Sequence, residues 1–201
     1  MFMRAESGIR ERVVLVDEED RELGAAEKLA VHADGRLHRA FSVFVFNGKG
    51  QLLLQRRAAT KYHSGGSWAN TCCGHPRPFE PVVDAAHRRL REEMGFDCPL
   101  QPVTTFLYKA PVGDRLVEHE FDHLLVGRFE GRPVPHPSEV DGWCWMDVRA
   151  VSEDVRAHPG RYAAWFPMAL ERLLVRGLLR PPETAAEEQP APPGAAVSAI
   201  S

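Results

Sequence analysis

The sequence predicts an α+β fold in a single compact domain, with strands and helices arranged in mixed layers. The 201 residues suffice for one well-buried core and are short for two. Segments rich in Val, Leu and Phe recur between turn-forming residues, whereas longer helical patterns occur only in one central segment and near the C-terminus. That order of elements is typical of α+β domains.

The N-terminal part is predicted to consist mainly of strands. Residues 10–18 predict an opening strand, residues 20–24 a turn, and residues 26–31 a short helix that leads into a polar loop. Two strands, 41–46 and 51–57, follow this loop and are rich in Val, Leu and Phe. The tetrapeptide Asn-Gly-Lys-Gly between them predicts a hairpin.

The remainder is predicted to be a loop, a central helix and a mixed C-terminal part. Residues 58–80 contain Gly and Pro breakers and predict mostly loop. Residues 81–94 predict a helix, with Pro81 near its start and Gly95 as its C-terminal cap. Further elements are expected in this order: strands near 103–109, 117–129 and 142–146, a helix from Asp147 to about 155, and an amphipathic helix at 162–178.

The two ends of the chain are predicted to lie outside the folded domain. Residues 1–9 have no apolar core followed by a cleavage site, so we expect a flexible N-terminus that is not a secretory signal. Residues 181–201 are Pro/Ala-rich with few large apolar side chains and predict a disordered tail, which leaves 10–180 as the domain. Four cysteines without a Cys-x-x-Cys pair favour a reduced, cytoplasmic setting.

Charge and hydropathy restrict the expected partners. The net charge of -3 gives no sign of a nucleic-acid binder, and no apolar run approaches the ~20 residues that span a bilayer. Arginines cluster locally, at Arg56-Arg57 and at Arg88-Arg89 with Arg91. This pattern suits a small anionic ligand, and nothing in the sequence requires a membrane or an obligate protein partner.

Residue types that bind metals occur in three separate segments. His32 and His38 flank one short loop, His75 lies in the long loop, and Glu118 and Glu120 alternate on a predicted strand so that both face one side. Three imidazoles and two carboxylates suit Mn²⁺ or Zn²⁺, with octahedral geometry favoured over a closed tetrahedral site. Each residue taken alone is more often an ordinary surface or core group, so this prediction requires that the segments converge.

A second constellation runs from Gly74 to Phe96, GHPRPFEPVVDAAHRRLREEMGF. Two arginine–glutamate pairs lie one helical turn apart on the predicted helix, which gives a possible cradle for Mg²⁺ and a diphosphate. The alternative is a solvated helix with ordinary ion pairs. The segment resembles the Nudix box, Gly-x5-Glu-x7-Arg-Glu-x2-Glu-Glu-x-Gly, but has Arg89 where a hydrolase has a metal-binding glutamate. That substitution disfavours pyrophosphohydrolase activity.

An arginine in place of this glutamate matches one branch of the Nudix superfamily. The chain resembles the type I isopentenyl-diphosphate delta-isomerases. The resemblance extends over roughly residues 10–180, and its segments are AEKLAVHADGRLHRAFSVFVFN, QLLLQRRAATKYHSGGSWANTCCGHP, FLYKA and VEHE. It implies a Nudix-like mixed sheet sandwiched by helices. It also implies interconversion of isopentenyl and dimethylallyl diphosphate through a tertiary carbocation, in isoprenoid precursor biosynthesis.

The resemblance implies the catalytic residues and the first metal site. Cys73 and Glu120 are the expected catalytic pair, with Tyr108 assisting Glu120. Protonating an unactivated double bond and removing another proton requires two groups and a site that excludes water. An aromatic face would steady the cation, with Trp68 and Trp165 as candidates. The expected ligands of Mn²⁺ or Zn²⁺ are His32, His38, His75, Glu118 and Glu120.

The resemblance also implies how the diphosphate is held. Glu93 and the backbone carbonyl of Cys73 are expected to bind a Mg²⁺ that also contacts the diphosphate. Arg89 then acts as an anion binder in place of the hydrolytic metal ligand. The expected phosphate contacts are Lys28, Arg57, Lys61 and Arg89.

Two other functions remain open on the sequence alone. A Nudix pyrophosphohydrolase would release phosphate or pyrophosphate, and it would not require Cys73 or the Glu118/Glu120 pair. A metal-stabilised module that only binds anions would have no turnover to lose when Cys73 is replaced.

Overall fold

The computed structural model describes residues 11–113 and 115–177. Within that part the strands form one mixed sheet. Its path is β2 (Glu22–Glu27), β1 (Arg12–Val16), β3 (His38–Phe46), β4 (Gln51–Arg57) and β5 (Trp68–Ala69), and β3 also pairs with β6 (Cys72–Gly74) and β8 (Leu116–Arg128). The predicted flexible N-terminus at 1–9 and the predicted tail at 181–201 lie outside the described residues. No helix in the described ranges is both long and apolar enough to cross a bilayer.

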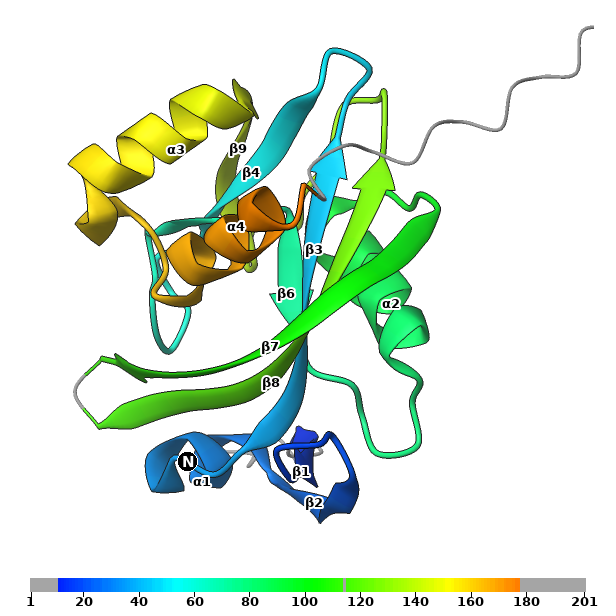
Figure 1. The fold of residues 1–201 in the computed structure, drawn as a ribbon, viewed down its shortest axis with the longest axis vertical. Helices are drawn as coiled ribbons and strands as arrows, with labels where there is room; N and C mark the ends of the chain where they lie inside the picture. The colour runs from blue at the N-terminus through cyan, green and yellow to red at the C-terminus, as the bar shows by residue number, and fades with distance from the viewer. Residues whose placement is uncertain (1–10, 114, 178–201) are drawn as a thin grey trace, which may run out of the picture.

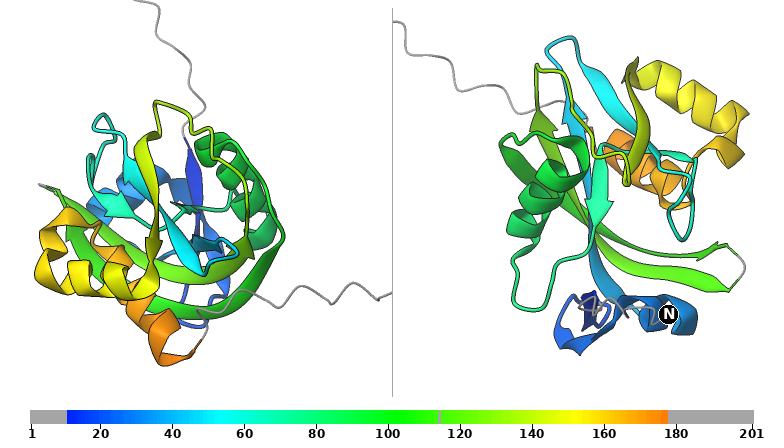
Figure 2. Two further views of the ribbon diagram at one scale, coloured as in Figure 1. Left: turned by 90° about the horizontal axis from the view of Figure 1, so that it is seen from above. Right: turned by 180° about the vertical axis from the view of Figure 1, so that it is seen from behind.

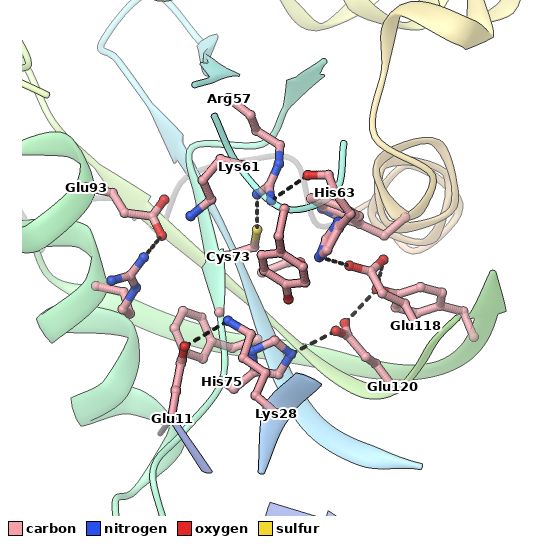
Figure 3. A pocket seen from close by; sticks show the side chains of 17 residues that line it. Glu11, Lys28, Arg57, Lys61, His63, Cys73, His75, Glu93, Glu118 and Glu120 are labelled. Carbon is pink, nitrogen blue, oxygen red and sulfur yellow. Dashed lines mark hydrogen bonds and ion pairs between the residues drawn. The ribbon is translucent and has the colours of Figure 1, made fainter. Parts of the chain in front are cut away.

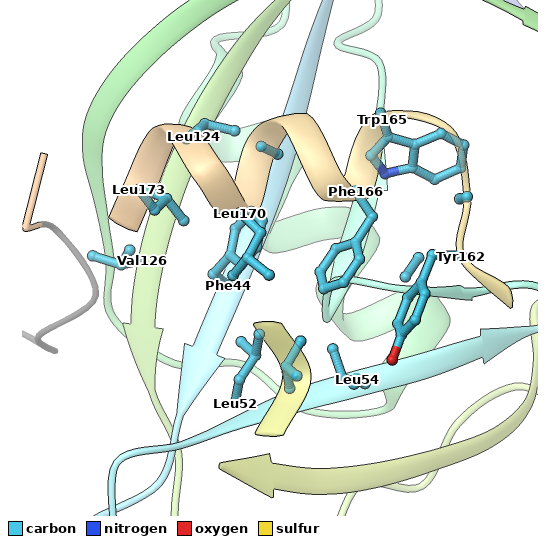
Figure 4. Packing of buried hydrophobic residues seen from close by; sticks show 14 of the residues in the cluster. Phe44, Leu52, Leu54, Leu124, Val126, Tyr162, Trp165, Phe166, Leu170 and Leu173 are labelled. Carbon is cyan, nitrogen blue, oxygen red and sulfur yellow. The ribbon is translucent and has the colours of Figure 1, made fainter. Parts of the chain in front are cut away.

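The predicted α+β architecture is confirmed, since helices cover both faces of the central strands (Figure 1). One cluster joins the helices α3 (Val148–Ala157) and α4 (Trp165–Val175) to the sheet through residues such as Phe44, Phe166 and Leu170. Figure 4 shows α4 laid across these side chains. A second cluster on the opposite face joins α2 (Val82–Met94) through Val43 and Leu90. Seen from behind and from above, α2 stays on the side away from α3 and α4 (Figure 2).

The strand β3 (His38–Phe46) is central because its two faces are both apolar. Phe44 and Phe46 face one cluster, and Phe41, Val43 and Val45 face the other. A strand buried on both faces pairs favourably in a parallel arrangement. Accordingly, β3 runs parallel to β8 (Leu116–Arg128), which forms a long antiparallel hairpin with β7 (Leu100–Val112).

The predicted hairpin between β3 and β4 (Gln51–Arg57) is only partly formed. The turn closes as expected, with Gly50 N donating to Asn47 O at 2.9 Å, but the strands pair only at Phe46 and Leu52. Beyond that point β4 pairs with β9 (Val140–Asp147). The hydroxyl of Thr71 fills the gap, accepting from Val45 N and donating to Leu53 O.

Residues 58–80 are mostly loop, as predicted, but they also contain β5 (Trp68–Ala69) and β6 (Cys72–Gly74), which are too short to show a period in the sequence. The predicted turn at 20–24 begins earlier, because the carboxylate of Asp17 accepts from the backbone N–H of Glu19 and Arg21.

That earlier turn changes the elements around it. β1 (Arg12–Val16) pairs with β2 (Glu22–Glu27), and the first helix, α1 (Lys28–Asp34), starts two residues later than predicted. The last predicted helix, 162–178, likewise begins later, at Trp165 after a short 3-10 turn (Pro159–Arg161). By contrast, Asp147 caps α3 as expected, by accepting from Arg149 N at 2.9 Å.

The central helix α2 ends as predicted, at Gly95 with a left-handed φ of +72°. A Cβ at Gly95 would lie 2.1 Å from the backbone oxygen of Val134. We therefore expect Gly95→Ala to lower the free energy of unfolding by about 2–4 kcal/mol in urea titrations, from φ strain and a backbone clash. Gly50→Ala is the matched control, because Gly50 has a φ of +74° and open space around it, and should cost only about 1 kcal/mol. If both variants lose the same free energy of unfolding, the clash with Val134 does not contribute.

Candidate active site

A polar cavity opens at the point where β3, β6 and β8 meet the loop after β4 (Figure 3). Acidic, basic, imidazole and thiol side chains face it from both halves of the chain. It is lined by Glu11, Lys28, Phe41, Ser42, Arg57, Lys61, Tyr62, His63, Cys73, Gly74, His75, Arg89, Glu93, Tyr108, Glu118, Glu120 and Trp165.

Four of the five predicted metal ligands converge at one end of this cavity. The parallel register places His38 of β3 beside Glu120 of β8, and β6 leads directly to His75. His75 Nε2 lies 3.0 Å from Glu120 Oε1 and 3.2 Å from His38 Nε2. With His32 of α1, their ligand atoms all lie within 4.8 Å of one another.

The chemistry of these groups fits a divalent ion. Nδ1 of His32 and Nδ1 of His38 each lie within 2.9 Å of a backbone carbonyl, which can only accept, so each Nε2 carries its lone pair toward the cluster. Nε2 of His32 is buried and has no hydrogen-bond partner. Burial lowers the pKa of His32, and lowers that of His75 to about 3, so both imidazoles are neutral, as a metal ligand must be.

Glu118 belongs to an adjoining group. Its ligand atom clusters with those of His32 and His63, also within 4.8 Å of one another. Glu118 and Glu120 share one face of β8 and are buried, whereas His119 points away and contacts Gly35 O at 3.1 Å. The alternation predicted from the sequence is therefore present.

The phenol of Tyr108 connects the two carboxylates. Its hydroxyl donates to Glu120 Oε2 at 2.6 Å and lies 3.1 Å from Glu118 Oε2. Burial raises the pKa of Tyr108 well above its usual value, and the two carboxylates add to this effect. The phenol therefore stays protonated and can donate a hydrogen bond across the physiological range.

The two carboxylates differ in their protonation. Burial raises the pKa of Glu118 well above its usual value, and the charge of Glu120 raises it further. Burial acts in the same direction on Glu120, but its hydrogen bond with His75 Nε2, at 3.0 Å from Oε1, outweighs burial and holds the pKa of Glu120 well below its usual value. Glu120 is therefore the carboxylate that stays ionised.

Cys73 and Cys72 are adjacent but face opposite sides of β6. Cys72 is fully buried against α2, whereas Cys73 lines the cavity, where Arg57 Nη1 donates to its Sγ at 3.9 Å. Asn70 fixes this strand by donating to Val43 O and Cys72 O. Burial raises the pKa of Cys73 to about 12, although the charge of Arg57 opposes the shift. The thiol is therefore protonated at neutral pH.

This pKa makes a prediction for thiol chemistry. In metal-free protein, the rate of alkylation of Cys73 by iodoacetamide should rise about tenfold per pH unit from pH 7 to 10, because only the thiolate reacts. Mass spectrometry of the Cys73 peptide would follow the reaction. Glutathione is the control, and its alkylation rate should level off near the pKa of its own thiol. If the alkylation rate of Cys73 also reaches a plateau by pH 9, the raised pKa of Cys73 is contradicted.

The opposite end of the cavity is rich in ion pairs. Arg89 of α2 donates to Glu93 Oε1 at 2.5 Å, and Gln55 Nε2 donates to Glu93 Oε2 at 3.0 Å. Lys61 pairs with Glu139, which also lies 3.3 Å from Arg89. Each predicted phosphate contact at this end is therefore held by a carboxylate of the chain.

Lys28 and Arg57 line the same cavity from other elements. Lys28 pairs with Glu11 at 3.1 Å and lies over the ring of Tyr62. Arg57 is more enclosed than a surface phosphate contact would be. It is only 6% exposed, and its guanidinium lies 5.1 Å from the ring centroid of Trp165.

The helix α2 carries ion pairs both at the cavity and away from it. Both pairs expected one turn apart are formed, Arg88 to Glu92 at 3.3 Å and Arg89 to Glu93 at 2.5 Å. Arg88 also binds Glu80 through two hydrogen bonds of 2.6 and 2.8 Å and does not line the cavity. The Glu80–Arg88 part of the frame is thus structural, and only the Arg89–Glu93 part faces the cavity.

Several cavity residues carried no signal in the sequence. Glu11, Tyr62 and His63 come from loops or element ends, where no periodicity marks the face of a side chain. Asp122 continues the buried face of β8 and accepts from the Ser42 hydroxyl at 2.8 Å; the alternation that marked Glu118 and Glu120 could have identified it.

Of the two tryptophan candidates, only one lies at the cavity. Trp165 lines it and is fixed by its indole N–H, which donates to Asn70 Oδ1 at 3.0 Å. Trp68 lies on β5, packs against the core cluster and does not line the cavity, so the structure favours Trp165 of the two.

Comparisons with known proteins identify the family of this chain. Residues 36–166 match the NUDIX domain family. An isopentenyl-diphosphate Delta-isomerase 2 of Aromatoleum aromaticum is 52% identical over 83% of this chain and 88% of its own. An isopentenyl-diphosphate Delta-isomerase of Burkholderia multivorans is 52% identical over 82% of this chain and 93% of its own.

Solved structures confirm the predicted Nudix-like fold. A crystal structure of a Deinococcus radiodurans protein has a TM-score of 0.67 at 22% identity, covering 81% of this chain and 98% of that one. A MutT protein of Methanosarcina mazei has a TM-score of 0.57 at 17% identity, covering 70% and 95%. These two structural similarities show the fold alone. The two relatives with 52% sequence identity show the branch of the family. The chain therefore belongs to the Nudix family and, within it, to the isopentenyl-diphosphate Delta-isomerases.

Proposed function

We propose that this chain interconverts isopentenyl diphosphate and dimethylallyl diphosphate, with Cys73 and Glu120 as its two proton-transfer groups. The observation that carries the assignment of this pair is that both side chains line one cavity, where the Tyr108 hydroxyl donates to Glu120 Oε2 at 2.6 Å. Burial raises the pKa of the Cys73 thiol to about 12, whereas the hydrogen bond with His75 lowers the pKa of Glu120 below its usual value. A group that can give a proton thus lies in the same cavity as a group that can take one.

This pair meets the requirements of the reaction. Protonation of the terminal carbon of isopentenyl diphosphate gives a tertiary cation, and loss of a proton from the neighbouring methylene gives dimethylallyl diphosphate. The reaction needs one acid and one base, which exchange roles in the reverse direction. Tyr108 holds Glu120 in position through its hydroxyl, so the carboxylate does not have to reorient during the reaction.

The proposed metal roles follow the two ends of the cavity. His32, His38, His75, Glu118 and Glu120 would hold Mn²⁺ or Zn²⁺, and that ion would fix Glu120 and adjust its acidity. Glu93 and the backbone carbonyl of Cys73 would hold Mg²⁺ next to the diphosphate. Lys28, Arg57, Lys61 and Arg89 would supply positive charge to the phosphate oxygens.

The diphosphate would act as a handle for the small carbon skeleton. Binding energy from the charged end holds the alkene between Cys73 and Glu120. Trp165, whose ring already lies near the Arg57 cation, offers a π face toward the cavity where positive charge develops. Phe41 and Tyr62 add to the walls that keep water from the cation.

The test is incubation of purified protein with isopentenyl diphosphate, Mg²⁺ and Mn²⁺, followed by NMR of the alkene region. Dimethylallyl diphosphate should form without phosphate release. Release of phosphate or pyrophosphate without the isomer would support the hydrolase alternative, which Arg89 at the hydrolytic ligand position disfavours. Binding of the diphosphate without any product would support the anion-binding module.

A further inference from the structure

His63 is the one imidazole in the cavity for which neither the sequence motifs nor the proposed reaction has a use. It lies in the loop after β4, and its side chain is only 4% exposed. Its ring stacks on that of His32, with a centroid distance of 5.9 Å. In Figure 3 it points toward Glu118 across the cavity.

Two groups of possible metal ligands share His32. One group of ligand atoms comprises His32, His38, His75 and Glu120, and the other comprises His32, His63 and Glu118. His32 is common to both groups, and its Nε2 has no hydrogen-bond partner. One ion near that nitrogen would therefore lie between the two groups.

The loop directs Nε2 of His63 toward this position. Nδ1 of His63 lies 3.3 Å from the Ser64 hydroxyl, and Arg57 Nη2 donates to the His63 carbonyl at 3.3 Å. Ser64 itself has a left-handed φ of 50°, a conformation that non-glycine residues seldom adopt. The loop tolerates this conformation while Nε2 remains available to the cavity.

The distance to Glu118 favours a shared ion over a direct hydrogen bond. His63 Nε2 lies 3.5 Å from Glu118 Oε1, beyond the ordinary length of an N–H···O bond. Neighbouring donors around an octahedral ion with bonds of roughly 2.1–2.2 Å lie about 3 Å apart, so a small inward shift brings both onto one ion.

We propose that His63 is a further ligand of the Mn²⁺ or Zn²⁺ centre, binding through Nε2 beside Glu118. The proposal rests on the proposed function only in placing that ion at this site. The chain then offers four imidazoles and two carboxylates, which are the six donors of an octahedral ion. Such a centre has no position open to substrate, so the diphosphate would contact the cationic side chains and the Mg²⁺ and not this ion.

The test counts imidazoles on the ion without using turnover. X-ray absorption and pulsed EPR of Mn²⁺-loaded protein, without substrate, should report four imidazole nitrogens in the unmodified chain and three in His63→Gln. Mn²⁺ affinity, measured by calorimetry, should fall at least tenfold. His123→Gln is the matched control, because His123 pairs with Asp20 outside both groups and should leave the count unchanged.

The possible outcomes distinguish direct metal binding by His63 from an indirect effect through Glu118. The same imidazole count in the unmodified chain and in His63→Gln overturns the proposal, even if affinity falls, because His63 would then act only through Glu118. A loss of one imidazole supports it whether or not the protein isomerises isopentenyl diphosphate. Isomerase activity with three imidazoles in the unmodified chain leaves the proposed function intact and rejects the role of His63. Circular dichroism of the metal-free variant checks the fold.

Discussion

Cys73→Ala should lower kcat for isomerisation by about 10²–10⁴-fold while the protein stays folded. General acid–base groups contribute rate factors of this size, and alanine removes the only thiol that lines the cavity within the described residues. NMR of isopentenyl diphosphate turnover would measure kcat, and circular dichroism would check the fold. KM should change little, because the phosphate contacts lie on other residues.

The neighbouring cysteine provides a matched control for this experiment. Cys72→Ala changes the same atoms one residue earlier, but on the face of β6 that packs against α2. It should lower the free energy of unfolding by about 1 kcal/mol and leave kcat nearly unchanged. Equal loss of kcat in both variants, or substantial activity in Cys73→Ala, would remove Cys73 from the catalytic pair.

Glu120→Gln should reduce kcat at least as much, for two separable reasons. The amide can no longer accept a proton, and it is also a weaker metal ligand next to His38 and His75. Metal content must therefore be measured in the same samples. A variant that retains its metal but loses kcat isolates the role of Glu120 in proton transfer.

The parts of the site that were predictable from sequence depend on local spacing. Alternation on a strand places Glu118 and Glu120 on one face in any sheet, and helical spacing pairs Arg89 with Glu93 in any helix. The convergence of His38, His75 and Glu120 is different, because parallel pairing of β3 with β8 and antiparallel pairing of β3 with β6 bring it about. Only the family resemblance anticipated that convergence.

The unpredicted parts depend on long-range contacts that leave no local pattern. The splitting of the β3–β4 hairpin follows from Thr71, which bridges the two strands from a segment that appeared to be loop. His63 and Glu139 likewise reach the site from loops, where backbone turns and not periodicity set the direction of a side chain. Local pattern likewise could not show that Trp165 lines the cavity and Trp68 does not.

Arg89→Gln should raise KM for isopentenyl diphosphate by about 10–100-fold, because it removes a charged donor worth roughly 1.5–3 kcal/mol at the phosphate end. Arg88→Gln is the matched control, since Arg88 is the adjacent arginine of α2 but pairs with Glu80 away from the cavity. The control should lose stability and keep its KM. Equal KM changes in the two variants would show that the helix, and not the Arg89 guanidinium, holds the diphosphate.

Arg89→Glu extends this test to the choice between isomerase and hydrolase. It restores the Nudix glutamate but adds a carboxylate beside Glu92, Glu93 and Glu139, where Arg89 now balances their charge. Mg²⁺ should bind more tightly in calorimetry without substrate, while KM for isopentenyl diphosphate rises beyond that of Arg89→Gln through repulsion of the anion. If Mg²⁺ affinity rises while KM stays unchanged, residue 89 is not a phosphate contact. That result would contradict the view that Arg89 replaces the metal-binding glutamate of the hydrolases with a group that binds the diphosphate.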